Sequence, residues 1–76
     1  MKRDTHANKI TTSEAAAIIG ASPQFVRAAM QQQCLPIGVA VKMNGSSKWT
    51  YNISAKLLED YTGKNIDQEL ERIRNN

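Results

Sequence analysis

The chain has 76 residues, with ten basic and seven acidic side chains for a net charge of +3, and only one cysteine and one histidine. A chain of this length forms one domain at most, and folding buries only about 60% of the surface that the unfolded chain exposes, so a deep catalytic pocket would remove much of the core. One cysteine excludes an internal disulfide bond and a zinc site built from several cysteines, and His6 has no second histidine with which to share a metal. We therefore expect no enzyme, no metal site and no other cofactor.

Residues 1–9 carry charges without apolar periodicity, which favours a flexible basic arm. They also lack the apolar segment of a signal peptide. The longest apolar run, Ala15 to Ile19, is far shorter than the ~20 residues that a membrane span needs. We therefore expect a soluble, cytoplasmic protein with no membrane partner.

A first helix is predicted over residues 12–19. Thr11 and Glu14 have the spacing of a capping box, in which each side chain bonds to the backbone amide of the other residue. The segment is rich in alanine, and its inner face is marked by Ala15, Ile18 and Ile19. Gly20 follows, where a left-handed stop residue belongs.

A second helix is predicted from Ser22, which can cap it, through Pro23 at the first helical position to about Gln33. Its inner face is marked by Val26, Ala29 and Met30, and its outer face by Gln24, Arg27, Ala28 and Gln31. Because only three residues separate the two helices, they must cross steeply, as in a helix-turn-helix. Cys34, just after the second helix, is expected to be half-buried as a small apolar residue.

A β-hairpin is predicted next, with strands at residues 38–43 and 48–53. The Asn44-Gly45 pair is the strongest turn signal between them and indicates a tip of about four residues. We expect the alternating side chains of the second strand to pack on the helices, because a two-stranded hairpin is marginal alone. These side chains are Trp49, Tyr51 and Ile53.

Two more helical segments complete the pattern. Ser54 caps a predicted helix over residues 55–62, with an inward face of Leu57, Leu58 and Tyr61 and a stop at Gly63. A short amphipathic segment starts at Asn65 and carries Ile66, Leu70 and Ile73 on one stripe. That stripe either folds back onto the core or forms a patch for a second copy or a protein partner.

The predicted fold class is therefore mostly α with a small β-hairpin (α+β), a winged helix-turn-helix. We divide the chain into the arm (1–9), the winged helix-turn-helix domain (10–63) and a C-terminal amphipathic helix or tail (64–76). Residues 1–58 hold seven basic and two acidic side chains, whereas residues 59–76 hold three basic and five acidic ones. This asymmetry predicts that the body faces a polyanion and that the acidic end stays away from it.

Part of this pattern, over roughly residues 10–62, is similar to a known family. The matching positions are Thr11, Glu14, Ala15, Ala16, Ile19, Gly20, Ala21, Ser22, Val26, Met30, Leu35, Pro36, Ile53, Ser54, Leu58 and Tyr61, with the hairpin between them. Together they resemble the excisionase and MerR-type winged helix-turn-helix domains, most closely the short versions carried by phages and integrative elements. The resemblance implies that the second helix enters the major groove of double-stranded DNA and that the hairpin acts as a wing. It also implies self-association on DNA and contact with an integrase or another regulatory protein.

The outer face of the second helix carries the predicted base contacts. Glutamine pairs with adenine, arginine with guanine, and alanine contacts the thymine methyl group. Phe25 either completes the core against the wing or stays exposed for DNA or partner contact. The predicted residues of this helix are Ser22, Gln24, Phe25, Arg27, Ala28 and Gln31.

The predicted wing contacts go to phosphates or the minor groove. They are Lys42, Asn44, Gly45, Ser46, Ser47 and Lys48. Weaker contacts to the DNA backbone are predicted for Lys2, Arg3, Lys9 and Thr12.

The sequence therefore predicts sequence-specific binding of double-stranded DNA by an excisionase-like recombination directionality factor or a small transcriptional regulator. The alternative is a protein-interaction module on the same fold, an antirepressor or inhibitor. Arg27 stands almost alone among glutamines on the second helix, and this favours the alternative.

Overall fold

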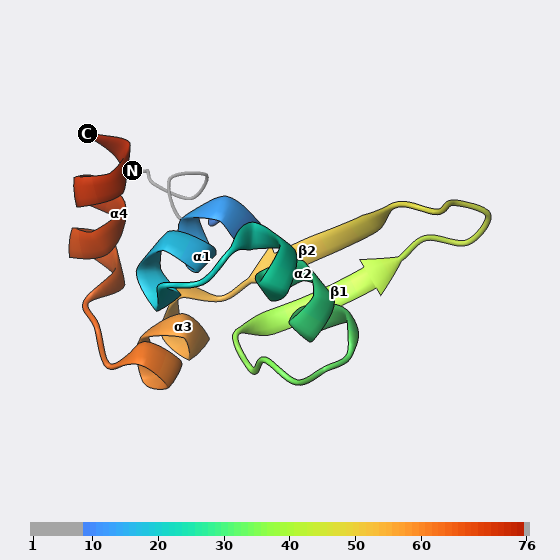
Figure 1. Cartoon of the computed structure of the whole chain (residues 1–76), viewed down its shortest axis with the longest axis horizontal. Helices are drawn as coiled ribbons and strands as arrows, with labels where there is room; N and C mark the ends of the chain where they lie inside the picture. Colours follow the sequence, from blue (N-terminus) through green and yellow to red (C-terminus); the bar gives the residue numbers. More distant parts are fainter. Residues whose placement is uncertain (1–8, 76) are drawn as a thin grey trace, which may run out of the picture.

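The computed structural model describes residues 9–75, so the predicted contacts of Lys2 and Arg3 lie outside the described residues. The elements are α1 (Thr12–Ile19), α2 (Pro23–Gln31), β1 (Gly38–Lys42), β2 (Trp49–Ile53), α3 (Ala55–Thr62) and α4 (Ile66–Arg74). The helices gather at one end and the hairpin projects from the other (Figure 1). The described part of the chain is thus a small α+β structure of four helices and a two-stranded antiparallel hairpin, as the mostly α prediction required. None of the described helices is long and apolar enough to cross a membrane.

The ends of the first two helices follow local sequence signals. The Thr11 Oγ1 atom accepts a hydrogen bond from the Glu14 amide, and the Glu14 carboxylate accepts one from the Thr11 amide, so the predicted capping box is confirmed. Gly20 ends α1 at a φ of 91°, a left-handed conformation that costs glycine little. The helix α2 ends at Gln31, two residues earlier than predicted, and Gln33 takes up a positive φ of 59° in the turn that follows.

The core is built from the inner faces of the helices and the base of the hairpin. Ile18, Val26, Ile37 and Leu58 are its fully buried side chains of largest volume. The other buried core residues are Ile10, Ala15, Ala16, Met30, Leu35, Ile53, Ile66 and Leu70. No polar or charged side chain is buried among the described residues, so the polar groups remain at the surface.

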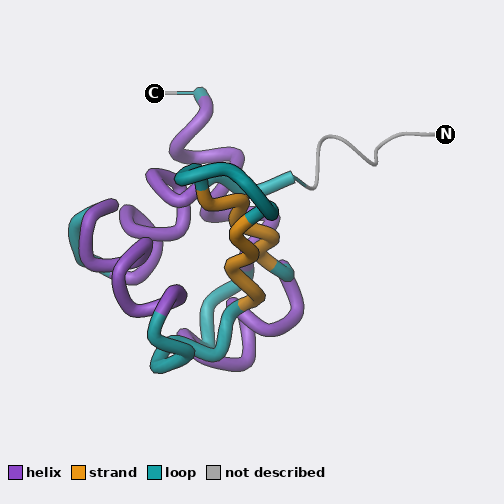
Figure 2. Tube along the Cα trace, turned by 90° about the vertical axis from the view of Figure 1, so that its right-hand side faces the viewer, coloured by secondary structure: helices purple, strands orange, loops and turns teal. Residues whose placement is uncertain are grey.

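The hairpin pairs β1 and β2 antiparallel, with Ala40 opposite Tyr51 and Lys42 opposite Trp49. The strands are one residue shorter at the tip than predicted on each side, so six residues rather than about four connect them. The base of the hairpin is held by the core, since Ile53 is buried and also forms an isolated bridge with Ile10. Figure 2 turns the end that carries the hairpin toward the viewer.

The apolar stripe of the C-terminal segment was predicted either to fold back onto the core or to form an exposed patch. Ile66 and Leu70 are buried and Ile73 packs partly buried against the core, so α4 folds back onto its own chain. An ion pair strengthens this packing, because Arg74 Nε lies 2.7 Å from Glu14 Oε2 at the start of α1.

Three burial predictions are wrong. Leu57 and Tyr61 are 43% and 49% exposed, because α3 contacts the core through the Leu58 side of its surface. Cys34 is exposed rather than half-buried, because it lies in the turn after α2, where Gln33 has a positive φ of 59° and the buried face of the helix has ended.

Candidate nucleic-acid interface

The outer face of α2 presents polar and small side chains to solvent. Gln24, Ala28 and Gln31 are exposed, as their spacing along one stripe of the helix predicted. Their outward direction follows from the burial of Val26 and Met30 on the opposite face. The start of α2 is capped by Ser22, whose Oγ accepts a hydrogen bond of 3.1 Å from the Phe25 amide. The exposed stripe therefore lies on a helix whose first turn and inner face are both anchored.

Phe25 was predicted either to complete the core or to stay exposed, and the structure shows it exposed. Its side chain is 52% exposed, so it does not complete the core. An aromatic side chain of this exposure, directly beside Gln24, adds an apolar contact to the polar stripe.

The Arg27 side chain forms a hydrogen bond with α1, the preceding helix. The Arg27 Nη1 atom donates to Thr12 Oγ1 at 3.3 Å, and both side chains are half-buried. Thr12 was predicted as a weak contact to the DNA backbone, but the structure places its hydroxyl against Arg27. A guanidinium carries five N–H donors, so this one bond uses only part of the donor capacity of Arg27.

Gln31 is also engaged within the protein. Its Nε2 atom donates to the hydroxyl of Tyr51 on β2 at 2.6 Å. Tyr51 was predicted to pack on the helices, and its half-buried ring does pack against the core, while its hydroxyl reaches the end of α2. Twenty residues separate the partners, so no local sequence pattern signals the pair.

The loop of the hairpin is ordered by short-range bonds. The Ser46 amide donates to the Met43 carbonyl at 3.1 Å, and the Lys48 amide donates to Ser46 Oγ at 3.0 Å. Gly45 has a φ of 74°, as the third residue of a type II turn requires. The two flanking lysines, Lys42 and Lys48, are exposed, so this loop presents two cations on a folded tip.

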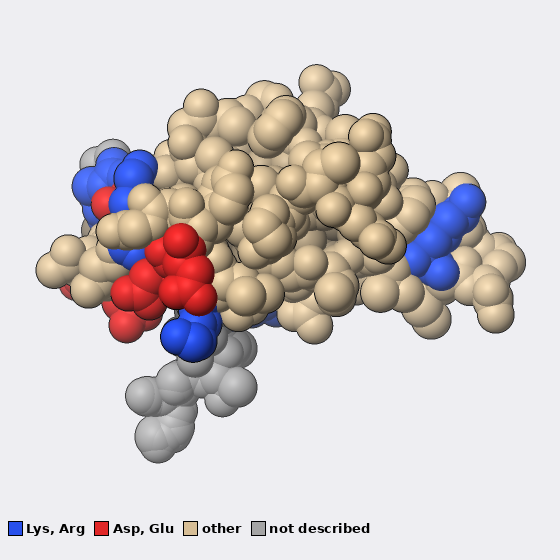
Figure 3. Space-filling view, turned by 90° about the horizontal axis from the view of Figure 1, so that it is seen from below, with Lys and Arg blue, Asp and Glu red and all other residues tan. Residues whose placement is uncertain are grey.

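Acidic side chains lie toward one end of the molecule, whereas basic side chains occur at both ends (Figure 3). No acidic residue occurs between Ala15 and Leu58, a segment that contains α2 and the whole hairpin. The acidic side chains gather over the other end of the molecule, and Figure 3 shows this separation on one face. Exposed acidic residues of that end are Glu59, Asp60, Asp67 and Glu71.

The Glu14 carboxylate, in the first turn of α1, is paired with the positive charge of Arg74. Hydrogen bonding from Arg74 is the largest cause that holds the pKa of Glu14 below its ordinary value, against the opposing effect of burial. The same pair raises the pKa of Arg74. The Glu69 pKa is lowered in the same way by its ion pair with Arg72 on α4.

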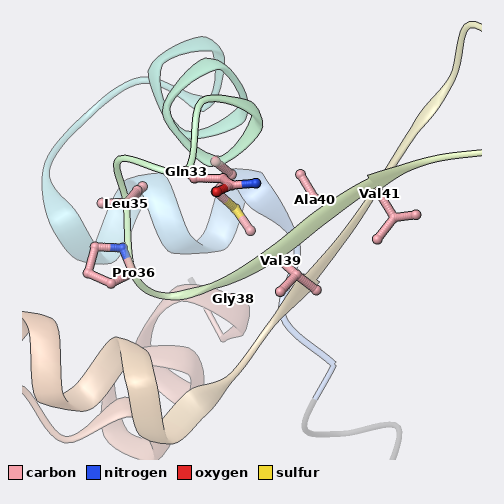
Figure 4. Close-up of a pocket in the computed structure, with 8 residues that line it drawn as sticks. Gln33, Leu35, Pro36, Gly38, Val39, Ala40 and Val41 are labelled. Atoms are coloured by element: carbon pink, nitrogen blue, oxygen red, sulfur yellow. The ribbon is translucent and has the colours of Figure 1, made fainter.

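Sequence inspection missed an apolar face on the hairpin. Val39, Val41 and Met43 are 57%, 49% and 60% exposed. Beside β1 lies an open hollow of about 440 Å³ that reaches from Met30 and Gln33 to the strand. Figure 4 shows Ala40 directed toward α2, whereas Val39 and Val41 point to the opposite side of the strand. These three residues alternate along the chain, but alternation alone does not show whether the face they form is covered.

Within residues 9–75 no group of three or more histidine, cysteine, aspartate or glutamate side chains is placed to hold a metal ion. Comparison of the chain with family models, with curated proteins and with solved structures finds no match in any of the three.

Proposed function

We propose that α1, α2 and the hairpin form a winged helix-turn-helix that binds specific sequences of double-stranded DNA. The observation that carries this proposal is the exposed polar stripe of α2 beside a lysine-bearing hairpin, within a segment of the chain that holds no acidic residue. A helix with glutamine and arginine on one face matches the donors and acceptors of base edges in the major groove. Lysines on a hairpin tip match the phosphates beside it.

The proposed biological role is that of an excisionase-like recombination directionality factor or a small transcriptional regulator of a phage or other mobile element. The resemblance of residues 10–62 to those families supports this role. The acidic end formed by α3 and α4 points away from a duplex on electrostatic grounds, which leaves it accessible to an integrase, another regulator or a second copy. A recombination assay with purified integrase separates the two roles, because only a directionality factor shifts the balance between integration and excision.

The test of DNA binding is a salt series with a duplex selected from a random pool by the protein itself. Each phosphate contact adds about −0.9 to the slope of log K against log salt. Replacing both Lys42 and Lys48 with alanine removes up to two such contacts, so the slope becomes shallower by up to about 1.8. Lys56→Ala on α3 is the matched control, because it removes one exposed positive charge outside the proposed interface. An identical slope in wild type and the double variant, or no binding at low salt, contradicts the proposal.

A protein-interaction module on the same fold is the second candidate function. The exposed Phe25 and the apolar face of Val39, Val41 and Met43 favour it, because clustered exposed apolar side chains mark surfaces that associate with other proteins. This function predicts a partner that stays bound at 1 M salt while DNA does not bind at any salt concentration.

A further inference from the structure

The direction of the hairpin relative to α2 depends on a few contacts near its base. A two-stranded hairpin is marginally stable by itself, and the tip of this one extends beyond the helices (Figure 1). Ala40 and Tyr51 face each other across the strands, and both pack partly buried against the core. No side chain of residues 41–50 packs against the core, although Trp49 is half-buried, so Ala40 and Tyr51 are the outermost core contacts of the hairpin.

The hydrogen bond between Gln31 and Tyr51 lies at this point. Gln31 is the last residue of α2, and its amide nitrogen donates to the Tyr51 hydroxyl at 2.6 Å. The Tyr51 ring is half-buried against the core, so its hydroxyl is presented from a ring that the protein already holds. The bond therefore joins the end of the helix directly to the strand that leads to the wing tip.

We infer that Gln31 and Tyr51 form a brace that sets the direction of the wing relative to α2, and that base reading is left to Gln24 and Ala28. This inference rests on the proposed function. A glutamine that reads adenine directs both its amide nitrogen and its amide oxygen at the same base edge. The nitrogen of Gln31 is directed at Tyr51 instead, whereas Gln24 and Ala28 are exposed on the same stripe closer to the start of the helix. Gln31 is thus a positioning residue rather than a base contact.

The geometry makes the brace important at the wing tip. Ser46 lies five positions before Tyr51 in the chain and is thus at most about 17 Å away, because even a fully extended chain advances only ~3.3 Å per residue. A change of about 10° in the direction of the hairpin at Tyr51 then moves the tip by up to about 3 Å. That displacement matches the whole length of a hydrogen bond, so it is enough to separate the tip from a phosphate.

The experiment is a double-mutant cycle with Gln31→Ala and Tyr51→Phe, measured on the selected duplex and on duplexes with each base pair changed in turn. Tyr51→Phe keeps the ring and removes only the hydroxyl. Losing one hydrogen bond of this kind weakens binding by about 2- to 10-fold. We expect each single variant to weaken binding to all duplexes by a similar factor in this range, and the double variant to bind no more weakly than the singles. Gln24→Ala, in contrast, removes the preference at one base pair.

Gln32→Ala is the matched control, because Gln32 is the neighbouring exposed glutamine at the same end of the helix. The inference is overturned if Gln31→Ala removes the preference at a base pair that Tyr51→Phe still recognises, because Gln31 then reads that base. The inference is also overturned if the loss of affinity in the double variant equals the product of the losses in the two single variants.

A readout on the free protein separates failure of the brace from failure of the proposed function. Hydrogen exchange of the hairpin backbone amides is measured for the same four proteins without DNA. Both single variants are expected to speed exchange equally, and the double variant no further. If wild type binds no DNA but shows this pattern, the proposed function fails and the brace stands. If hydrogen exchange of the hairpin amides is the same in the variants as in wild type, the brace is overturned, whatever the result with DNA.

Discussion

The contact between Glu14 and Arg74 provides the sharpest test of how α4 is held. The Glu14 carboxylate accepts hydrogen bonds from Arg74 Nε at 2.7 Å and Arg74 Nη2 at 3.2 Å, and from the Thr11 amide at 3.0 Å. The Glu14 side chain is only 16% exposed and that of Arg74 is 38% exposed. Glu14→Gln keeps an oxygen for the Thr11 amide and removes the charge that Arg74 binds, so it isolates the ion pair from the capping box.

The expected loss is about 1 kcal/mol of unfolding free energy. Hydrogen bonds to charged groups contribute about 1.5–3 kcal/mol, whereas exposed ion pairs contribute about 0.2–1 kcal/mol. The partial exposure of Arg74 places this pair between the two ranges, near the lower one. For a domain of this size a loss of 1 kcal/mol lowers the melting temperature by about 4–8 °C, which circular dichroism measures directly.

The effect must also depend on pH in one direction. Because Arg74 holds the native pKa of Glu14 below its ordinary value of 4.5, the folded state keeps this carboxylate ionised at a pH where the unfolded chain binds a proton. The stabilisation is therefore complete above that value and is lost as the pH falls through the lowered native pKa. The difference in melting temperature between wild type and Glu14→Gln should thus be largest near pH 7 and disappear in acid.

Glu71→Gln is the control, since it removes the same charge at an exposed position of α4, the helix that carries Arg74, and should change stability by less than about 0.5 kcal/mol. A Glu14→Gln variant as stable as wild type at pH 7 refutes the role assigned to the ion pair. A destabilisation that persists unchanged in acid also refutes it, because protonated Glu14 no longer carries the charge.

Three further predictions concern packing, backbone and contact with DNA. Leu70→Ala, at a side chain that is 5% exposed, should cost about 2–5 kcal/mol in chemical denaturation, and a loss below 1 kcal/mol would mean that α4 does not cover the core. Gly20→Ala should cost about 1–2 kcal/mol because φ is 91° there, although nothing lies within 4 Å of the added methyl group, and an unchanged melting temperature would contradict a left-handed residue at the end of α1. Arg27→Ala should weaken binding to the selected duplex by about 1–3 kcal/mol in fluorescence anisotropy if the guanidinium pairs with guanine, and unchanged affinity would remove Arg27 from the interface.

The order and type of the elements could be predicted because their signals are local. The capping box of Thr11 and Glu14, the Ser22 and Ser54 caps and the turn at Gly45 each act over four residues or fewer. Such short-range interactions form whenever the residues stand at the right spacing, with little dependence on the rest of the fold. The errors at helix and strand ends, such as the end of α2 at Gln31, come from a turn whose sequence carries no stop residue.

The candidate site was predictable as a set of positions but not as a set of interactions. The spacing of Gln24, Ala28 and Gln31 placed them on one stripe, and the structure exposes them. Periodicity cannot show which polar side chains of that stripe bond within the protein, because their partners lie on other elements. Arg27 finds Thr12 at a separation of 15 residues, and Gln31 finds Tyr51 at a separation of 20 residues.

Local patterns in the chain were thus sufficient to define its helices, its hairpin and the inner face of most of them. Only the packed structure decided that Phe25, Leu57 and Tyr61 face solvent, because exposure depends on which neighbours cover a side chain. It also decided that α4 returns to the start of α1, where Arg74 meets Glu14 across 60 residues of sequence. Contacts between distant residues depend on how all the elements pack together, and no short stretch of sequence contains that information.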